Sequence, residues 1–151
     1  MREAFGTSFV VSAVIIFVAI FIFFFVAGMS YTKAFKTKNR IIDIIEENGG
    51  YDETAKSEIA SILKESGYRI KSGNPDCEKI GRIKDIKQAN GDSFENLTQS
   101  SNTYRYCVYS IKTNSRGKYY GAVAFMYFDL PLGFGTMEFP VYGETKVIGE
   151  Y

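Results

Sequence analysis

The sequence predicts an α+β fold: a long N-terminal helix, a short second helix and an antiparallel sheet of three to five strands. Three observations predict this fold. Residues 9–28 are apolar apart from Ser12, over a length of about twenty residues. Helical periodicity continues through residues 29–48 without glycine or proline. The C-terminal third is rich in tyrosine and alternates in polarity, which is typical of strands with one wet face.

The apolar run has the length of a membrane span. A helix rises about 1.5 Å per residue, so about twenty residues cross roughly 30 Å of hydrocarbon. Apolar residues surround this helix, which argues against a helix lying on the membrane surface. The run is longer than the core of a secretory signal, and residues 27–30 make a poor cleavage site. We therefore expect one retained span, with residues 49–151 forming a small domain on one side.

The helix is expected to continue beyond the span as an amphipathic helix. Asn48, Gly49 and Gly50 form a strong stop signal, so one rod over residues 7–48, roughly 60 Å long, is predicted. Its apolar stripe needs a partner surface. The stripe contains Tyr31, Ala34, Phe35, Ile41, Ile42 and Ile45.

A second helix is predicted over residues 52–66. Asp52 or Thr54 can cap its start, and Gly67 ends it. Its expected apolar face contains Ala55, Ile59, Ile62 and Leu63. A short strand is expected at residues 68–71, followed by polar, irregular sequence over residues 72–102. Within that sequence, Asn90 and Gly91 suggest a small hairpin that begins with residues 79–88.

Three strands are expected in the C-terminal third, at residues 104–112, 119–128 and 137–148. The second is apolar on both faces, which predicts a central position in the sheet. Pro140 cannot donate a backbone hydrogen bond, so the third strand is expected at an edge or with a bulge.

Composition excludes several function classes. Lys and Arg total 18 against 17 Asp and Glu, so the chain lacks the positive field of a nucleic-acid-binding protein. Histidine is absent, which removes the usual zinc and Ser-His-Asp chemistries. Ser30 and Lys33 lie on continuous helix without a strained turn, so a Ser/Lys peptidase is not favoured. We expect no enzymatic activity, no cofactor and no metal.

Cys77 and Cys107 form no Cys-x-x-Cys motif, which argues against a thioredoxin-type site. Outside the cytoplasm the two residues would form one disulfide that closes a loop of about thirty residues. In the cytoplasm they would be two reduced thiols.

A basic patch of Lys33, Lys36, Lys38 and Arg40 follows the span, while Arg2 alone stands before it. The patch can bind anionic lipid headgroups. It can be a positive-inside signal, which would place the domain in the cytoplasm. It can also be a helix face that pairs with acidic residues of neighbouring subunits.

Small residues are scattered along the apolar half of the helix. They would allow a partner helix to approach closely, although they form no strict Gly-x-x-x-Gly motif. They are Ser12, Ala13, Ala19, Ala27 and Gly28.

This layout resembles type IV pilins, and especially the TadE-type pilin-like proteins of tight-adherence systems. Residues 1–6 resemble a short prepilin leader, charged and ending in Gly6. The resemblance implies cleavage by a prepilin peptidase between Gly6 and Thr7. It further implies an extracytoplasmic domain, possession of a disulfide and a place in a cell-surface filament or a secretion pseudopilus.

The implied role is structural: a subunit or assembly factor that acts by helix packing. The implied partners are membrane lipid, other pilin-like subunits or secretion-machine proteins, and the peptidase. Pilins usually carry a glutamate where this chain has Val11, and Phe or Met where it has Thr7. These departures favour a minor subunit or an uncleaved assembly factor. The alternative is a single-pass, membrane-anchored extracytoplasmic binding or sensor module.

Overall fold

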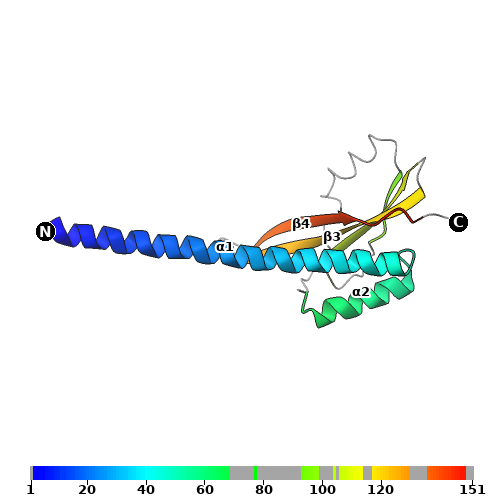
Figure 1. The fold of residues 1–151 in the computed structure, drawn as a ribbon, viewed down its shortest axis with the longest axis horizontal. Coiled ribbons are helices and arrows are strands. Elements are labelled where there is room, and N and C mark those ends of the chain that lie inside the picture. The colour runs from blue at the N-terminus through cyan, green and yellow to red at the C-terminus, as the bar shows by residue number, and fades with distance from the viewer. Residues whose placement is uncertain are drawn as a thin grey trace.

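The long helix dominates the molecule. The computed structural model describes residues 2–68, 77, 93–98, 104, 106–113, 117–129 and 136–148. Helix α1 spans Arg2–Glu47, 46 residues, and its first half projects far beyond the rest of the chain (Figure 1). The predicted rod over residues 7–48 is therefore confirmed, with an earlier start, because residues 2–5 contain no helix breaker.

The predicted stop signal ends α1 through a Schellman motif. Gly49 adopts a left-handed conformation with φ of 68°. Its N–H donates to the carbonyl of Glu46 at 3.2 Å, and the N–H of Gly50 donates to the carbonyl of Ile45 at 2.9 Å. These bonds satisfy carbonyls that the helix end would leave unpaired.

Helix α2, Glu53–Glu65, folds back beside the C-terminal half of α1 (Figure 1). Asp52 is its cap, because the Asp52 carboxylate accepts the N–H of Ala55 at 2.8 Å. Gly67, with φ of 58°, ends the helix. The N–H of Tyr68 donates to the carbonyl of Leu63 at 3.0 Å, so Tyr68 closes α2 and is not in a strand as predicted. Residues 69–71 of that predicted strand lie outside the described residues.

Four antiparallel strands form one sheet in the order β1-β2-β3-β4. They are β1 (Ser93–Asn96), β2 (Tyr106–Thr113), β3 (Gly117–Asp129) and β4 (Thr136–Glu144). The three predicted strands correspond to β2, β3 and β4. The central position of β3 is confirmed, and Pro140 lies in the edge strand β4, where its missing N–H is tolerated.

Strand β1 lies just after Asn90 and Gly91, where the second arm of the small hairpin was expected, in a region otherwise expected to be irregular. It pairs with β2, with Phe94 opposite Ile111, and the partner strand rather than local sequence makes it a strand. The first arm of that hairpin, residues 79–88, and its turn lie outside the described residues.

The segment that follows β4 is hydrogen-bonded to both β3 and α1. The Thr145 N–H donates to the Tyr120 carbonyl at 2.8 Å, and the Thr145 hydroxyl accepts the Tyr120 N–H at 2.9 Å. The N–H of Lys146 donates to the carboxylate of Glu46 at 2.7 Å. These bonds hold residues 145–146 against β3 and the C-terminal end of α1.

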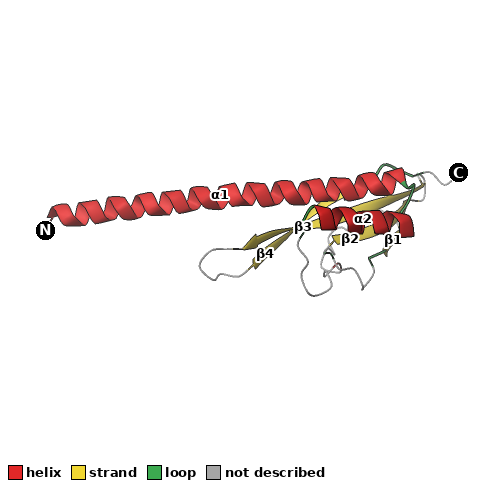
Figure 2. Ribbon diagram, turned by 90° about the horizontal axis from the view of Figure 1, so that it is seen from below, coloured by secondary structure: helices red, strands yellow, loops and turns green. Residues whose placement is uncertain are grey.

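Buried residues lie on both faces of the sheet, and helix α1 runs along one of these faces (Figure 2). On that face, Val108 and Ala122 pack with the buried residues of α1 and α2, including Ile45 and Ile59. The opposite face holds a second cluster around Cys107, Tyr109, Val123 and Phe125. The α+β fold class is therefore confirmed.

Helix α1 approaches β4 closely at Gly143. A Cβ atom at this position would lie 2.6 Å from Lys38 Cδ and 2.7 Å from Ile42 Cδ1. A side chain here would have to displace the ends of the Lys38 and Ile42 side chains, which pack against the Gly143 backbone.

We predict that Gly143→Ala lowers the free energy of unfolding by about 1–2 kcal/mol through overpacking. Urea unfolding of the full-length protein in detergent micelles would measure it. The matched control is Gly28→Ala, because a Cβ at Gly28 meets nothing within 4 Å and alanine favours helix. Equal stability of the two variants would contradict the close contact.

Candidate functional site

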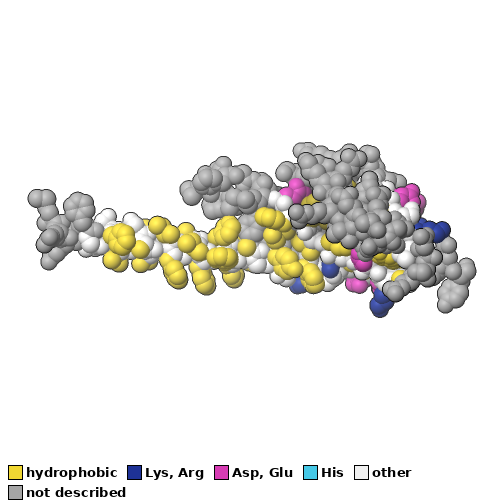
Figure 3. Space-filling model, turned by 90° about the horizontal axis from the view of Figure 1, so that it is seen from above, with side chains coloured by type: hydrophobic (Ala, Val, Ile, Leu, Met, Phe, Trp, Pro, Cys, Tyr) yellow, Lys and Arg dark blue, Asp and Glu magenta, His cyan; other side chains and the backbone are white. Residues whose placement is uncertain are grey.

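The first half of α1 is an apolar surface that the rest of the chain does not cover. Its best 18-residue window has a mean hydropathy of 3.3, and 0% of that window is buried. In the second half, Ile41 and Ile45 are at most 1% exposed. Figure 3 shows hydrophobic side chains along the projecting rod, whereas Lys, Arg, Asp and Glu gather over the domain. By length and composition this helix can cross a membrane, as an anchor or a signal.

The predicted small residues do not form one packing seam. At about 100° per residue, Ser12 and Ala19 share one helix face, whereas Ala13 and Gly28 lie on other faces. Ala27 is half-buried, and the other four are exposed. Their role in helix packing stays a prediction.

The predicted cleavage point lies inside regular helix. Gly6 and Thr7 both belong to α1, and the Gly6 position is exposed with open space around its Cα. Cleavage between them also stays a prediction.

The predicted basic patch is divided between two faces of α1. Lys33, Lys36 and Arg40 are exposed and follow a helical spacing of three and four. Lys38 lies on another face and is only 8% exposed. Its Nζ lies 4.4 Å from the centroid of the Phe35 ring, a cation–π contact.

The three exposed cations line a groove of about 370 Å³ between α1 and α2. The apolar lining of this groove is Ile41, Ile44, Ile59, Ile62 and Leu63. At one end, Lys33 Nζ donates to the Gly67 carbonyl at 2.9 Å and so ties the end of α2 to α1. A second, more open hollow beside Phe24, Phe25 and Met29 shares Lys33 and Lys36 with the groove.

The groove combines an apolar floor with a cationic rim, which suits an apolar segment that carries negative charge. The Lys33 ammonium is directed to the Gly67 carbonyl and not to Ser30. Among the described residues, no three His, Cys, Asp or Glu side chains gather as metal ligands. Sequence reasoning missed the groove. The spacing of Lys33, Lys36 and Arg40 could have separated them from Lys38.

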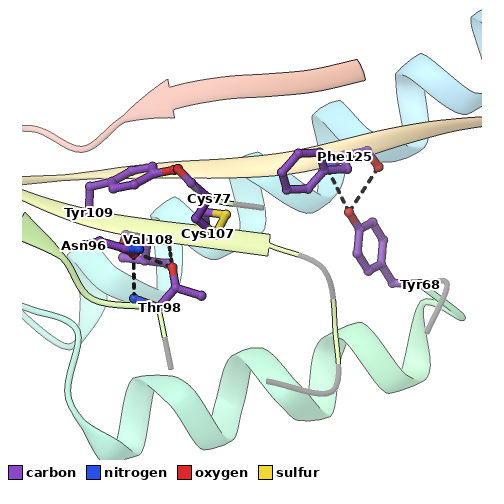
Figure 4. The surroundings of a disulfide bond; sticks show 8 residues. All are labelled: Tyr68, Cys77, Asn96, Thr98, Cys107, Val108, Tyr109 and Phe125. Atoms are coloured by element: carbon purple, nitrogen blue, oxygen red, sulfur yellow. Dashed lines mark hydrogen bonds between the residues drawn. A yellow bond between two sulfur atoms is a disulfide. The ribbon is translucent and has the colours of Figure 1, made fainter. Parts of the chain in front are cut away.

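A disulfide joins Cys77 to Cys107 in β2, with their Cα atoms 5.9 Å apart (Figure 4). The Tyr109 hydroxyl donates to the Cys77 carbonyl at 3.1 Å, and the Tyr109 ring lies against Phe94. Nearby, the Tyr68 hydroxyl accepts the Phe125 N–H at 2.9 Å and donates to the Phe125 carbonyl at 3.1 Å. A disulfide of this kind points to a domain outside the cytoplasm.

The chain combines a long apolar helix, a four-stranded antiparallel sheet packed on that helix, and a disulfide on the opposite face of the sheet. The architecture is pilin-like. The chain matches no protein family model, no curated protein and no solved structure. The pilin-like description therefore concerns the arrangement of helix, sheet and disulfide, and a specific role for this pilin-like chain is a matter of proposal.

We predict that the double variant Cys77→Ala, Cys107→Ala loses about 3–4 kcal/mol of unfolding free energy. The disulfide closes a loop with a sequence separation of 30 residues, and opening it restores entropy to the unfolded chain. Urea unfolding of the full-length protein in detergent, with and without reductant, would measure this. Reductant should destabilise the wild type and leave the variant unchanged.

We also predict a loss of stability at alkaline pH. Burial raises the pKa of Tyr109, so the folded protein retains a proton that the unfolded chain releases near pH 10. The contribution is complete below about pH 10 and falls as the pH rises further. Burial, followed by the hydrogen bond to Glu144, likewise raises the pKa of Tyr142.

Tyr109→Phe should reduce the alkaline slope of unfolding free energy by up to about 1.4 kcal/mol per pH unit. Urea unfolding between pH 8 and about 11.5 would compare this variant with the wild type. The lysines titrate in both proteins, so their contribution cancels in the difference between the two slopes. An unchanged slope would mean that Tyr109 ionises as freely in the folded protein as in the unfolded chain.

Proposed function

We propose that this protein is a structural subunit or assembly factor of a type IV pilus-like filament, of the tight-adherence kind, or of a secretion pseudopilus. It acts by helix packing and not by catalysis. The observation that carries the proposal is the division of α1: one unbroken helix is bare and apolar in its first half and forms the core of the domain in its second.

A bare apolar rod is stable only in a bilayer or against other apolar rods. An anchor alone needs no particular connection to its domain. Here no break in α1 separates the bare half from the half that is packed on the sheet, so the domain and the rod move as one body. Rigid coupling of this kind suits a subunit whose helices must be stacked in fixed positions.

We place the domain outside the cytoplasm. The disulfide supports this location, while the positive-inside rule opposes it. Two of the basic residues make contacts within the chain: Lys33 donates to the end of α2, and Lys38 packs on Phe35. Their presence therefore has a reason that is independent of membrane topology.

Membrane lipid would surround the apolar half before assembly, and other pilin-like subunits or secretion-machine proteins would surround it afterwards. A prepilin peptidase would cleave between Gly6 and Thr7. Val11, in place of the usual pilin glutamate, favours a minor subunit.

A second candidate is a membrane-anchored extracytoplasmic binding or sensor module. The groove between α1 and α2, with its basic rim, favours it. The two candidates differ in whether the leader is removed and whether the protein is found in material sheared from the cell surface.

The intact mass of the protein from its own host, with and without reductant and thiol alkylation, tests the proposal. Loss of residues 1–6, with cysteines that alkylate only after reduction, is the expected result. A full-length mass with an intact disulfide would favour the anchored module. A full-length mass with freely alkylated thiols would place the domain in the cytoplasm and overturn the proposal.

We predict that Val14→Asp removes the protein from sheared surface material. Val14 is 56% exposed on the apolar half, and a carboxylate there costs about 2.5–3.5 kcal/mol in an apolar surrounding. Val14→Leu is the control, since it preserves apolar character. Immunoblots of sheared and membrane fractions would measure both, and normal recovery of Val14→Asp in sheared material would count against helix packing.

A further inference from the structure

The groove between α1 and α2 meets a second hollow at the point where α1 leaves its apolar run. The second hollow has a volume of about 620 Å³ and lies beside Phe24, Phe25 and Met29 on the apolar half. Lys33 and Lys36 line both the groove and the hollow. A surface that can lie in hydrocarbon is therefore continuous with a cleft that carries positive charge.

Two cations at this junction are available to a ligand. Lys36 and Arg40 are exposed one helical turn apart, and within the described residues neither side chain makes a hydrogen bond or an ion pair. Side chains of a helix lean toward its N-terminus, which is the apolar end of α1. Their charged groups are therefore directed toward the membrane surface. Among the described residues, no acidic side chain lines either hollow.

Thr37 adds a hydroxyl between the two cations. It lines the groove and is only 7% exposed. Earlier in the helix, the Thr32 hydroxyl donates to the Gly28 carbonyl at 2.8 Å, which is a common local bond for threonine in a helix. The Thr37 hydroxyl has no hydrogen-bond partner in the described part of the chain. Polar groups in a cleft normally find a partner, so this hydroxyl is available to a ligand.

Helix α2 supplies the opposite wall of the cleft. Leu63 and Ser66 line it across from the cations, and the bond of 2.9 Å from Lys33 Nζ to the Gly67 carbonyl holds the end of α2 against α1. A basic stripe on a bare helix would attract any anionic surface. Here an anion would instead be enclosed between two helices.

We propose that this junction binds an anionic phospholipid of the surrounding membrane. Its phosphate lies between Lys36, Thr37 and Arg40, where an ammonium, a hydroxyl and a guanidinium donate to the phosphate oxygens. Its acyl chains lie along the second hollow, against Phe25 and Met29. Apolar contact supplies affinity for any phospholipid, and the charged contacts select an anionic headgroup over a zwitterionic one.

A lipid fits this junction better than an acidic protein segment does. A protein segment would occupy the groove and leave the second hollow empty, whereas a phospholipid joins a phosphate to apolar chains and fills both environments. The cations also follow the apolar run closely, at the level where headgroups lie.

Such a site would fix the depth and rotation of α1 in the bilayer, because the headgroup ties one face of the helix to the membrane surface. It would serve a filament subunit before assembly and an anchored module throughout. Lipid binding can therefore fail or succeed independently of the proposed function.

Native mass spectrometry of the full-length protein in detergent tests the headgroup contacts. Phosphatidylglycerol should bind more tightly than phosphatidylcholine with the same acyl chains. Lys36→Gln with Arg40→Gln should weaken phosphatidylglycerol binding about thirtyfold, since each cation contributes a factor of about five. Binding of phosphatidylcholine should not change. Equal affinity of the wild type for the two lipids would overturn the proposal.

The matched control is Lys112→Gln with Lys146→Gln. Both positions are exposed on the sheet, and the change removes the same charge. This control should bind phosphatidylglycerol as the wild type does. An equal loss in the control and in the Lys36, Arg40 variant would show attraction to overall charge and would overturn the site.

Thr37→Val separates the cleft from a merely charged surface. Valine keeps the branched shape of threonine and removes the hydroxyl, so binding of phosphatidylglycerol should weaken about tenfold. Unchanged binding would mean that the phosphate does not enter the groove. Soluble glycerol phosphate should not displace the lipid, and displacement at equal concentration would indicate an anion site without a lipid.

Gly28→Leu tests the position of the acyl chains. Gly28 lines the second hollow, and a Cβ there meets nothing within 4 Å, so leucine fills the hollow and should weaken binding of both lipids. Ala19→Leu, on the apolar half outside the hollow, is the control. Circular dichroism and the disulfide state of each variant establish that it is folded. Wild-type binding by Gly28→Leu would overturn the placement of the chains.

Discussion

Burial of the second half of α1 against the sheet is the interaction on which the rest of the structure depends. Ile41 and Ile45 are at most 1% exposed there, and Gly143 of β4 leaves room for the Lys38 and Ile42 side chains of α1. The first half of the same helix has no such cover. Because no break separates the halves, the packing that orients the domain also fixes the direction and rotation of the bare rod.

The two faces of the sheet are stabilised by different interactions. Apolar packing dominates beneath α1 and α2. The opposite face combines a disulfide with Tyr109, whose hydroxyl donates to the Cys77 carbonyl. This solution suits a small domain, which buries too little apolar surface to rely on one core alone. Covalent closure by Cys77 and Cys107 also agrees with a location where thiols are oxidised.

Packing α1 on the sheet leaves its outer face exposed, and several charged side chains lie on that face. Lys33 donates to the Gly67 carbonyl at the end of α2, and Lys38 packs on the Phe35 ring. Within the described residues, no hydrogen bond or ion pair involves the side chains of Lys36, Arg40, Asp43 and Glu47. The neighbouring groove between α1 and α2 widens the surface on which a partner could rest.

Local chemistry was sufficient to predict the elements whose limits depend on near neighbours. Asn48, Gly49 and Gly50 end α1, Asp52 caps α2, and Pro140 marks an edge strand, because caps, left-handed glycines and proline act within a few residues. Tertiary structure alone decided that residues 93–96 pair with β2 and that the Tyr68 hydroxyl binds the backbone of Phe125. Each of these depends on a surface supplied by a distant part of the chain. The sequence by itself therefore determined where the helices stop and which strand lies at an edge, and the assembled sheet decided which side of α1 is left for a partner.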